Sequence, residues 1–121
     1  MDTMSTFLTD FPHNHLRSYA QEGLFDSQKE ISPLDVFQLA CTSIVGAFVF
    51  TQFRGALERI AHYQHPILET IQNGTTFASL GISQLSTSHQ HREPPLIAHE
   101  TSTGFLLKGY APWVTGAHHA N

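Results

Sequence analysis

The sequence is poor in charge, in cysteine and in long hydrophobic runs. Only 13% of its 121 residues are charged, with six Lys and Arg against ten Asp and Glu, for a formal net charge of −4. The six cations are scattered along the chain, so no basic patch of the kind that nucleic-acid binding requires is formed and we expect no such partner. The single cysteine, Cys41, excludes an intramolecular disulfide. We therefore expect a reducing, cytoplasmic location.

The sequence also lacks signals for the membrane and for several common binding loops. Its most apolar stretch, residues 36–50, is about 15 residues long and shorter than the ~20 that a bilayer span requires, so we expect no membrane span. Residues 1–10 contain two acids and no base, unlike a signal peptide. The patterns G-x-x-x-x-G-K-S/T, G-x-G-x-x-G and H-E-x-x-H are missing, which excludes the phosphate and zinc sites that they build.

What the sequence does have is enough apolar material, 40% of residues, for one domain with a core. The apolar pattern is helical up to about Gly74 and favours strands and turns after it. Helices followed by antiparallel strands predict an α+β fold, in which N-terminal helices pack with a partial antiparallel sheet. We place a helical region at residues 1–74 and the start of a β-domain at residues 75–121.

The helical region contains clear start and stop signals. Ser32, Pro33 and Asp35 form a strong helix start, because a serine can cap and a proline suits the first turn. The segment after them, residues 35–53, is apolar on most sides and predicts a central helix in which Cys41 is a small core residue. Gly46 and Ala47 would let a neighbouring helix approach closely. We predict further helices at residues 12–24, 56–63 and 66–71, a break at Arg54-Gly55, and helix stops at Gly23 and at Asn73-Gly74.

Short β-type runs separated by turn residues follow. Residues 96–100 and 105–108 predict a hairpin around a turn at 101–104, and residues 83–93 predict a polar loop. We predict two more strands, at residues 76–82 and 113–115.

The most specific motif is the run Gly104-Phe-Leu-Leu-Lys-Gly-Tyr-Ala-Pro-Trp-Val-Thr-Gly-Ala117. A hairpin strand that ends in glycine, followed by Trp-Val-Thr-Gly, resembles the middle-domain signature of the acyl-CoA dehydrogenase family. The upstream segment Phe77-Ala-Ser-Leu-Gly-Ile-Ser-Gln-Leu85 falls where that family has its first flavin-binding strand. The two motifs agree with the family in register as well as in type, and the resemblance covers about residues 12–121.

The resemblance implies FAD-dependent oxidation of an acyl thioester across its α,β C–C bond, an oxidoreductase acting on a CH-CH group or a related flavin monooxygenation. It implies that Trp113 lies against the flavin ring and that Thr115 contacts the ring near its reactive nitrogen. A flat aromatic ring needs such a wall, and its polar edge needs hydrogen-bond partners. By the same resemblance the cofactor-binding residues are Leu80, Ile82, Ser83, Trp113, Val114 and Thr115, and His89, which stands where the family has a small hydroxyl residue, lies toward the acyl-CoA-type substrate.

The family's catalytic carboxylate lies in a C-terminal helical domain for which this sequence has no counterpart, so we assign no catalytic residue and expect the chain alone to be inactive. The low charge and the open strand edges favour a homo-oligomer. They also leave open an alternative function, a non-catalytic interaction module or degenerate remnant.

Histidine is abundant, with nine in the chain. His13 with His15, His62 with His65, and His89 with His91 have spacings that can chelate one metal. Because no cysteine and no regularly spaced carboxylate joins these pairs, we interpret them as neutral histidines on the surface and predict no metal site. A His-rich metal-binding protein is the weakest of the three hypotheses.

Overall fold

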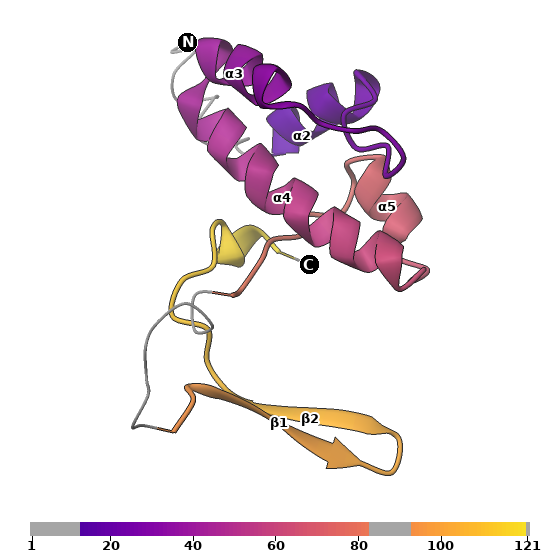
Figure 1. Cartoon of the computed structure of the whole chain (residues 1–121), viewed down its shortest axis with the longest axis vertical. Coiled ribbons are helices and arrows are strands. Elements are labelled where there is room, and N and C mark those ends of the chain that lie inside the picture. Colours follow the sequence, from indigo (N-terminus) through magenta and orange to yellow (C-terminus); the bar gives the residue numbers. More distant parts are fainter. Residues whose placement is uncertain (1–12, 83–92, 121) are drawn as a thin grey trace, which may run out of the picture. The chain divides into compact units, whose positions relative to one another are not determined.

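The structure, a computed structural model, describes residues 13–82 and 93–120 (Figure 1). In these residues the chain forms four α-helices and a two-stranded antiparallel sheet, which confirms the predicted α+β class. The chain divides into two compact units. One contains the described residues up to Ser79 and again from Gly116, and the other extends from Leu80 to Thr115. The domain boundary that we place at Gly74 stays a prediction.

The first described helix, α2 (His13–Gln21), is followed by a turn that contains Gly23, the glycine predicted to stop it. Gly23 has a φ of 71°, and the Leu24 N–H donates to the Tyr19 carbonyl at 2.9 Å. Glycine adopts this left-handed conformation without the steric cost that a side chain would add. The chain therefore leaves the helix in a tight turn, and Leu24 and Phe25 enter the core.

The second helix, α3 (Pro33–Thr42), begins with the predicted cap. The Ser32 hydroxyl accepts from the Asp35 N–H at 3.2 Å, and the Ser32 N–H donates to the Asp35 carboxylate at 2.7 Å. This reciprocal capping box satisfies two backbone donors that would otherwise lack partners at the helix end. Pro33 occupies the first turn, where its missing N–H costs nothing.

The prediction of one central helix over residues 35–53 is wrong. Ser43 is extended (φ −156°, ψ 112°), and it ends α3 and caps α4 (Ile44–His62) by accepting from the Gly46 N–H at 3.0 Å. No residue of α3 is fully buried, and Cys41 is exposed rather than in the core. The predicted break at Arg54-Gly55 is also wrong, because α4 continues through it. Buried Phe53, Ala56 and Leu57 on either side offset the modest cost of a glycine in the helix.

The short helix α5 (Leu68–Gln72) lies in the predicted place and ends as predicted. Gly74 has a φ of 75°, and a Cβ added there would lie 3.0 Å from the Leu16 carbonyl oxygen. Both the backbone conformation and the close approach to α2 therefore require glycine at this position. Thr75 and Thr76 donate their N–H groups to the Thr70 carbonyl at 3.1 and 3.0 Å. The chain then passes Phe77 into the core.

Aromatic side chains form the core of the helical unit. Phe25 lies 4.3 Å from Phe53 between ring centroids, and Phe50 meets Tyr19 edge-on at 5.6 Å. The small residues Gly46 and Ala47 admit α2 as expected, since a Cβ on Gly46 would lie 2.7 Å from the Tyr19 hydroxyl. Offset and edge-on ring pairs of this kind stabilise a core beyond the area that they bury.

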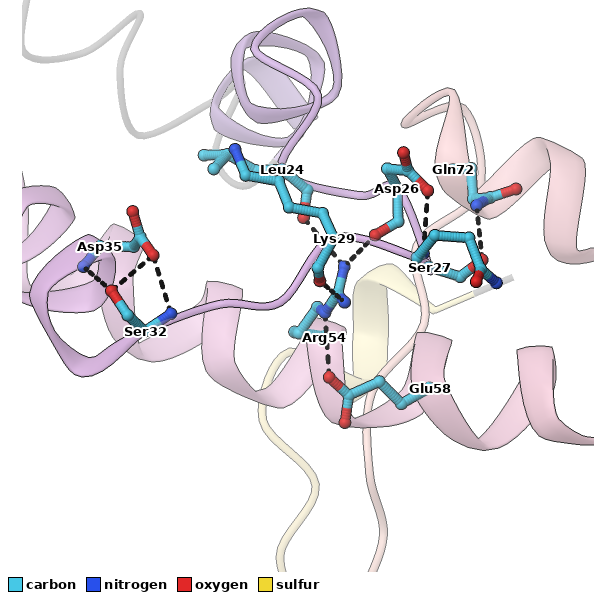
Figure 2. A network of polar contacts seen from close by, with 10 residues as sticks. Leu24, Asp26, Ser27, Lys29, Ser32, Asp35, Arg54, Glu58 and Gln72 are labelled. Carbon is cyan, nitrogen blue, oxygen red and sulfur yellow. Dashed lines mark hydrogen bonds and ion pairs between the residues drawn. The ribbon is translucent and has the colours of Figure 1, made fainter.

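One buried cation ties the loop before α3 to α4. Arg54 is 7% exposed and donates to the carbonyls of Leu24, Asp26 and Lys29 at 3.2, 2.6 and 2.6 Å (Figure 2). Its Nε also pairs with Glu58 one turn along α4 at 3.0 Å. A guanidinium presents five donors in a fixed fork and can therefore hold several carbonyls at once. This residue connects the loop to the helix that carries the core.

The second unit contains the predicted hairpin. Strands β1 (Leu96–Thr101) and β2 (Gly104–Gly109) pair antiparallel, with Leu96 opposite Gly109 and Thr101 opposite Gly104. The other two predicted strands are wrong, since residues 76–82 and 113–115 lie outside any strand. Residues 75–76 turn back to Thr70, and Gly116, with a φ of 67°, turns the chain into the 3₁₀ helix η1 (Ala117–His119). The described residues contain no helix that is both long and apolar enough to cross a membrane.

Candidate flavin-binding segments

The predicted flavin residues that the structure describes all belong to the unit that extends from Leu80 to Thr115. Leu80, Val114 and Thr115 are half-buried, whereas Ile82 and Trp113 are exposed. Ser83 and His89 lie outside the described residues. A binding site shared by these residues requires the segment around Leu80 to lie near the segment around Trp113.

These two segments, more than thirty residues apart in the chain, lie against each other at Gly81. A Cβ added to Gly81 would lie 3.1 Å from Cγ2 of Val114 and 3.3 Å from Cβ of Ala111. Both distances are tighter than most real side-chain contacts. Gly81 therefore allows a close approach, and it brings the backbone next to Leu80 and Ile82 alongside the backbone that carries Trp113.

A second glycine directs the chain from the hairpin to the tryptophan. Gly109 ends β2 with a φ of 128°, and a Cβ there would overlap the Pro95 carbonyl oxygen. The next residue, Tyr110, donates its N–H to that same Pro95 oxygen at 2.9 Å. Only glycine fits this corner, which explains why the hairpin strand ends in glycine just before the Trp-Val-Thr run.

Trp113 presents its indole outward, with 78% of the residue exposed. A large exposed aromatic face beside a hydroxyl residue two positions along, Thr115, offers a wall and a polar group to a flat heteroaromatic ligand. The described part of this unit also contains two carboxylates, Glu93 and Glu100, and both are exposed.

A cavity of about 300 Å³ lies in the helical unit between α2 and α3. Sequence reasoning missed it, and none of the predicted site residues lines it. Burial lowers the pKa of His15 in its wall, and burial followed by the charge of Glu22 raises the pKa of Tyr19. Both shifts keep these two side chains neutral near pH 7. The cavity volume lies at the lower limit for ligand pockets, and the flavin-type motif lies in the other unit.

The histidine pairs do not assemble into a cluster in the described residues. His62 and His65 are both exposed, and His65 Nδ1 accepts from the Ile67 N–H at 3.2 Å. Within residues 13–82 and 93–120, no three His, Cys, Asp or Glu side chains are close enough to hold a metal ion. His89 and His91 lie outside these ranges.

Comparison of the chain with protein-family models, with curated proteins and with solved structures finds no match.

Proposed function

We propose that this chain is part of an acyl-CoA dehydrogenase-like flavoprotein, in which FAD oxidises an acyl thioester across its α,β C–C bond. The proposal rests on the sequence motifs, and one structural observation supports it. The two segments that carry the motifs lie against each other at Gly81, with 3.1 Å between the position of its Cβ and Val114. Such an approach is what a ligand held by both segments would need.

The residues in this unit fit a flavin. The exposed face of Trp113 suits the flat ring, and the half-buried Thr115 suits a polar edge of that ring. Leu80 and Ile82 lie outside any helix or strand, so their backbone groups are not committed to a sheet. When bound, FAD would supply the hydride acceptor, and these residues would orient the ring and shield it from water.

The proposal assigns no catalytic base to this chain. Removal of the α proton needs a carboxylate held within hydrogen-bond reach of the substrate. We therefore expect the purified chain to bind flavin but to leave acyl-CoA unoxidised in the presence of an artificial electron acceptor. Turnover by the chain alone would contradict this part of the proposal.

Flavin titration tests the binding directly, because Trp113 is the only tryptophan and its fluorescence reports on the segment itself. We expect FAD to quench this emission and to acquire a shifted visible spectrum. Trp113→Ala should weaken binding by about tenfold, the value of a good aromatic contact. Thr115→Val should weaken it by a smaller factor while leaving the indole in place.

Tyr63→Ala provides a matched control, since Tyr63 is as exposed as Trp113 but belongs to the helical unit. Its substitution should leave the affinity for FAD unchanged. If FAD leaves the Trp113 emission and its own spectrum unaltered, or if Trp113→Ala binds FAD as the parent does, the flavin proposal fails.

The hairpin favours a second candidate function, a binding module for another polypeptide. All six residues of β2 are exposed, including Phe105, Leu106 and Leu107. Consecutive residues of a strand point to opposite faces, so each face of this hairpin carries exposed apolar side chains. A lone two-stranded sheet of this kind is marginal in water and offers open edges for strand addition. A chain without a flavin spectrum that forms a discrete complex through β2 would support this function.

A further inference from the structure

The helical unit carries an apolar stripe that its own core does not use. On α3, Leu34, Phe37 and Cys41 follow one another at helical spacing and are all exposed, with 62% of Leu34 and 63% of Phe37 open to solvent. The opposite side of α3 packs toward the core through Val36 and Leu39. An outward face of this composition is unusual, because surface helices normally point polar residues outward.

The stripe resumes on α4. Ile44, Val45 and Phe48 are 77%, 59% and 56% exposed, while Val49 and Phe50 on the other side of the helix are buried. Only Thr42 and Ser43 separate Cys41 from Ile44, so the two halves adjoin along the chain at the junction between the helices. We call the surface formed by Leu34, Phe37, Cys41, Ile44, Val45 and Phe48 the α3–α4 stripe.

The size and charge of the stripe suit a second copy of the chain. From their exposed fractions, its five large side chains together leave about 500 Å² of apolar surface open to solvent, comparable with the largest patch of a typical monomer. A standard interface takes about 800 Å² from each partner, of which about 65% is apolar when the partners are identical, so the stripe supplies the apolar part of one. Asp35 is the only charged residue between Pro33 and Phe53, so two copies would meet without repulsion.

We propose that the α3–α4 stripe is a self-association surface, on which a second copy of this chain docks through the same stripe. Two-fold pairing needs a patch that is complementary to itself, and an uncharged row of Leu, Phe, Ile and Val meets that condition. The pairing removes Phe37 and Phe48 from water on both copies at once. The inference is independent of the flavin proposal, whose residues belong to the other unit.

The test is the molar mass of the full chain in solution, measured by light scattering or sedimentation over a range of concentrations. We expect a dimer for the parent chain, and at least a tenfold higher dissociation constant for Phe37→Asp and for Phe48→Asp. Both side chains are mostly exposed, and circular dichroism should show helix content equal to that of the parent. Tyr63→Asp, at an even more exposed aromatic that caps the C-terminal end of α4, is the control that should stay dimeric.

Leu106→Asp on β2 separates this surface from the hairpin. A dimer that survives Leu106→Asp but not Phe37→Asp supports the stripe. A dimer with the opposite response, or a parent chain that stays monomeric at every concentration, overturns the inference.

The Cys41 thiol gives a second readout that does not depend on a substitution in the stripe. Because it is the only cysteine, its reaction with a maleimide is unambiguous. We expect the reaction to slow severalfold as the protein concentration rises into the dimer range. A rate that does not change with concentration while the mass doubles would place the interface elsewhere and overturn the inference.

Discussion

Replacement of Arg54 by methionine tests how the helical unit is held together. Methionine keeps the apolar stem of the side chain and removes the guanidinium. The carbonyls of Leu24, Asp26 and Lys29 then lose their donor at once. The loop before α3 would lose its attachment to α4, and with it the position of Phe25 in the core.

The size of this loss in stability depends on whether each carbonyl can bond to water once the guanidinium is removed. Hydrogen bonds to a charged group contribute about 1.5–3 kcal/mol each, and a buried acceptor left unpaired costs about 1–3 kcal/mol. The bond to Leu24 is buried, whereas the bonds to Asp26 and Lys29 are part-buried, so water can replace the guanidinium more readily at these two carbonyls. Glu58 is largely exposed, so its ion pair adds less than about 1 kcal/mol. We therefore expect Arg54→Met to lower the free energy of unfolding by about 3–5 kcal/mol.

Urea unfolding followed by circular dichroism at the helix band measures this loss. Arg54→Lys should recover only part of it, because one ammonium group cannot span three carbonyls that a planar fork reaches. Arg59→Met, on an exposed position of the same helix, should stay within about 0.5 kcal/mol of the parent. A loss below about 1 kcal/mol for Arg54→Met would refute the reasoning, because water would then replace the guanidinium without cost.

Three further outcomes test the local structure. Gly74→Ala should destabilise by more than about 1 kcal/mol, and by more than Gly23→Ala, because both glycines have positive φ but only Gly74 lacks space for a Cβ; equal losses in thermal unfolding would contradict this difference. Ser32→Ala should cost about 1 kcal/mol in urea unfolding through loss of the α3 cap, and an unchanged midpoint would argue against that cap. The Ser32 hydroxyl, followed by its backbone N–H, lowers the pKa of the Asp35 carboxyl below 3.8. The stability from these hydrogen bonds is therefore complete well above pH 3.8 and is lost as the pH falls through the folded-state pKa. The parent should lose stability in this range where Asp35→Asn does not, and parallel pH profiles would show that the bond is not formed.

Local signals predicted a good part of the helical unit. Ser32, Pro33 and Asp35 specify a helix start within four residues, and Gly23 and Gly74 specify turns that only glycine adopts readily. Such features depend only on residues that are adjacent in the chain, and they can therefore be predicted from a single sequence. The hairpin could be predicted for the same reason, since its two strands are separated only by a short turn.

Features that depend on distant parts of the chain could not be predicted. Ser43 lies within an apolar run, and periodicity alone does not reveal that it ends one helix and caps the next. Arg54 donates to carbonyls 25–30 residues earlier in the chain. Its role in holding that loop therefore cannot be predicted from the residues next to it in the sequence. The strands expected at residues 76–82 and 113–115 have strand-like composition, but a strand also needs a partner to pair with.

The exposed position of Cys41, a residue that the sequence pattern assigned to the core, has a physical cause. Sequence patterns identify apolar residues, and an apolar residue is assigned to the core unless its environment is known. On α3 the pattern continues around the helix, so it cannot separate the side that meets Val36 and Leu39 from the side that carries Phe37 and Cys41. Packing in three dimensions decides which side of the helix is buried. It leaves apolar side chains exposed on both units, in the α3–α4 stripe and at Trp113. The experiments on Phe37 and on Trp113 therefore address distinct surfaces, and either result can hold without the other.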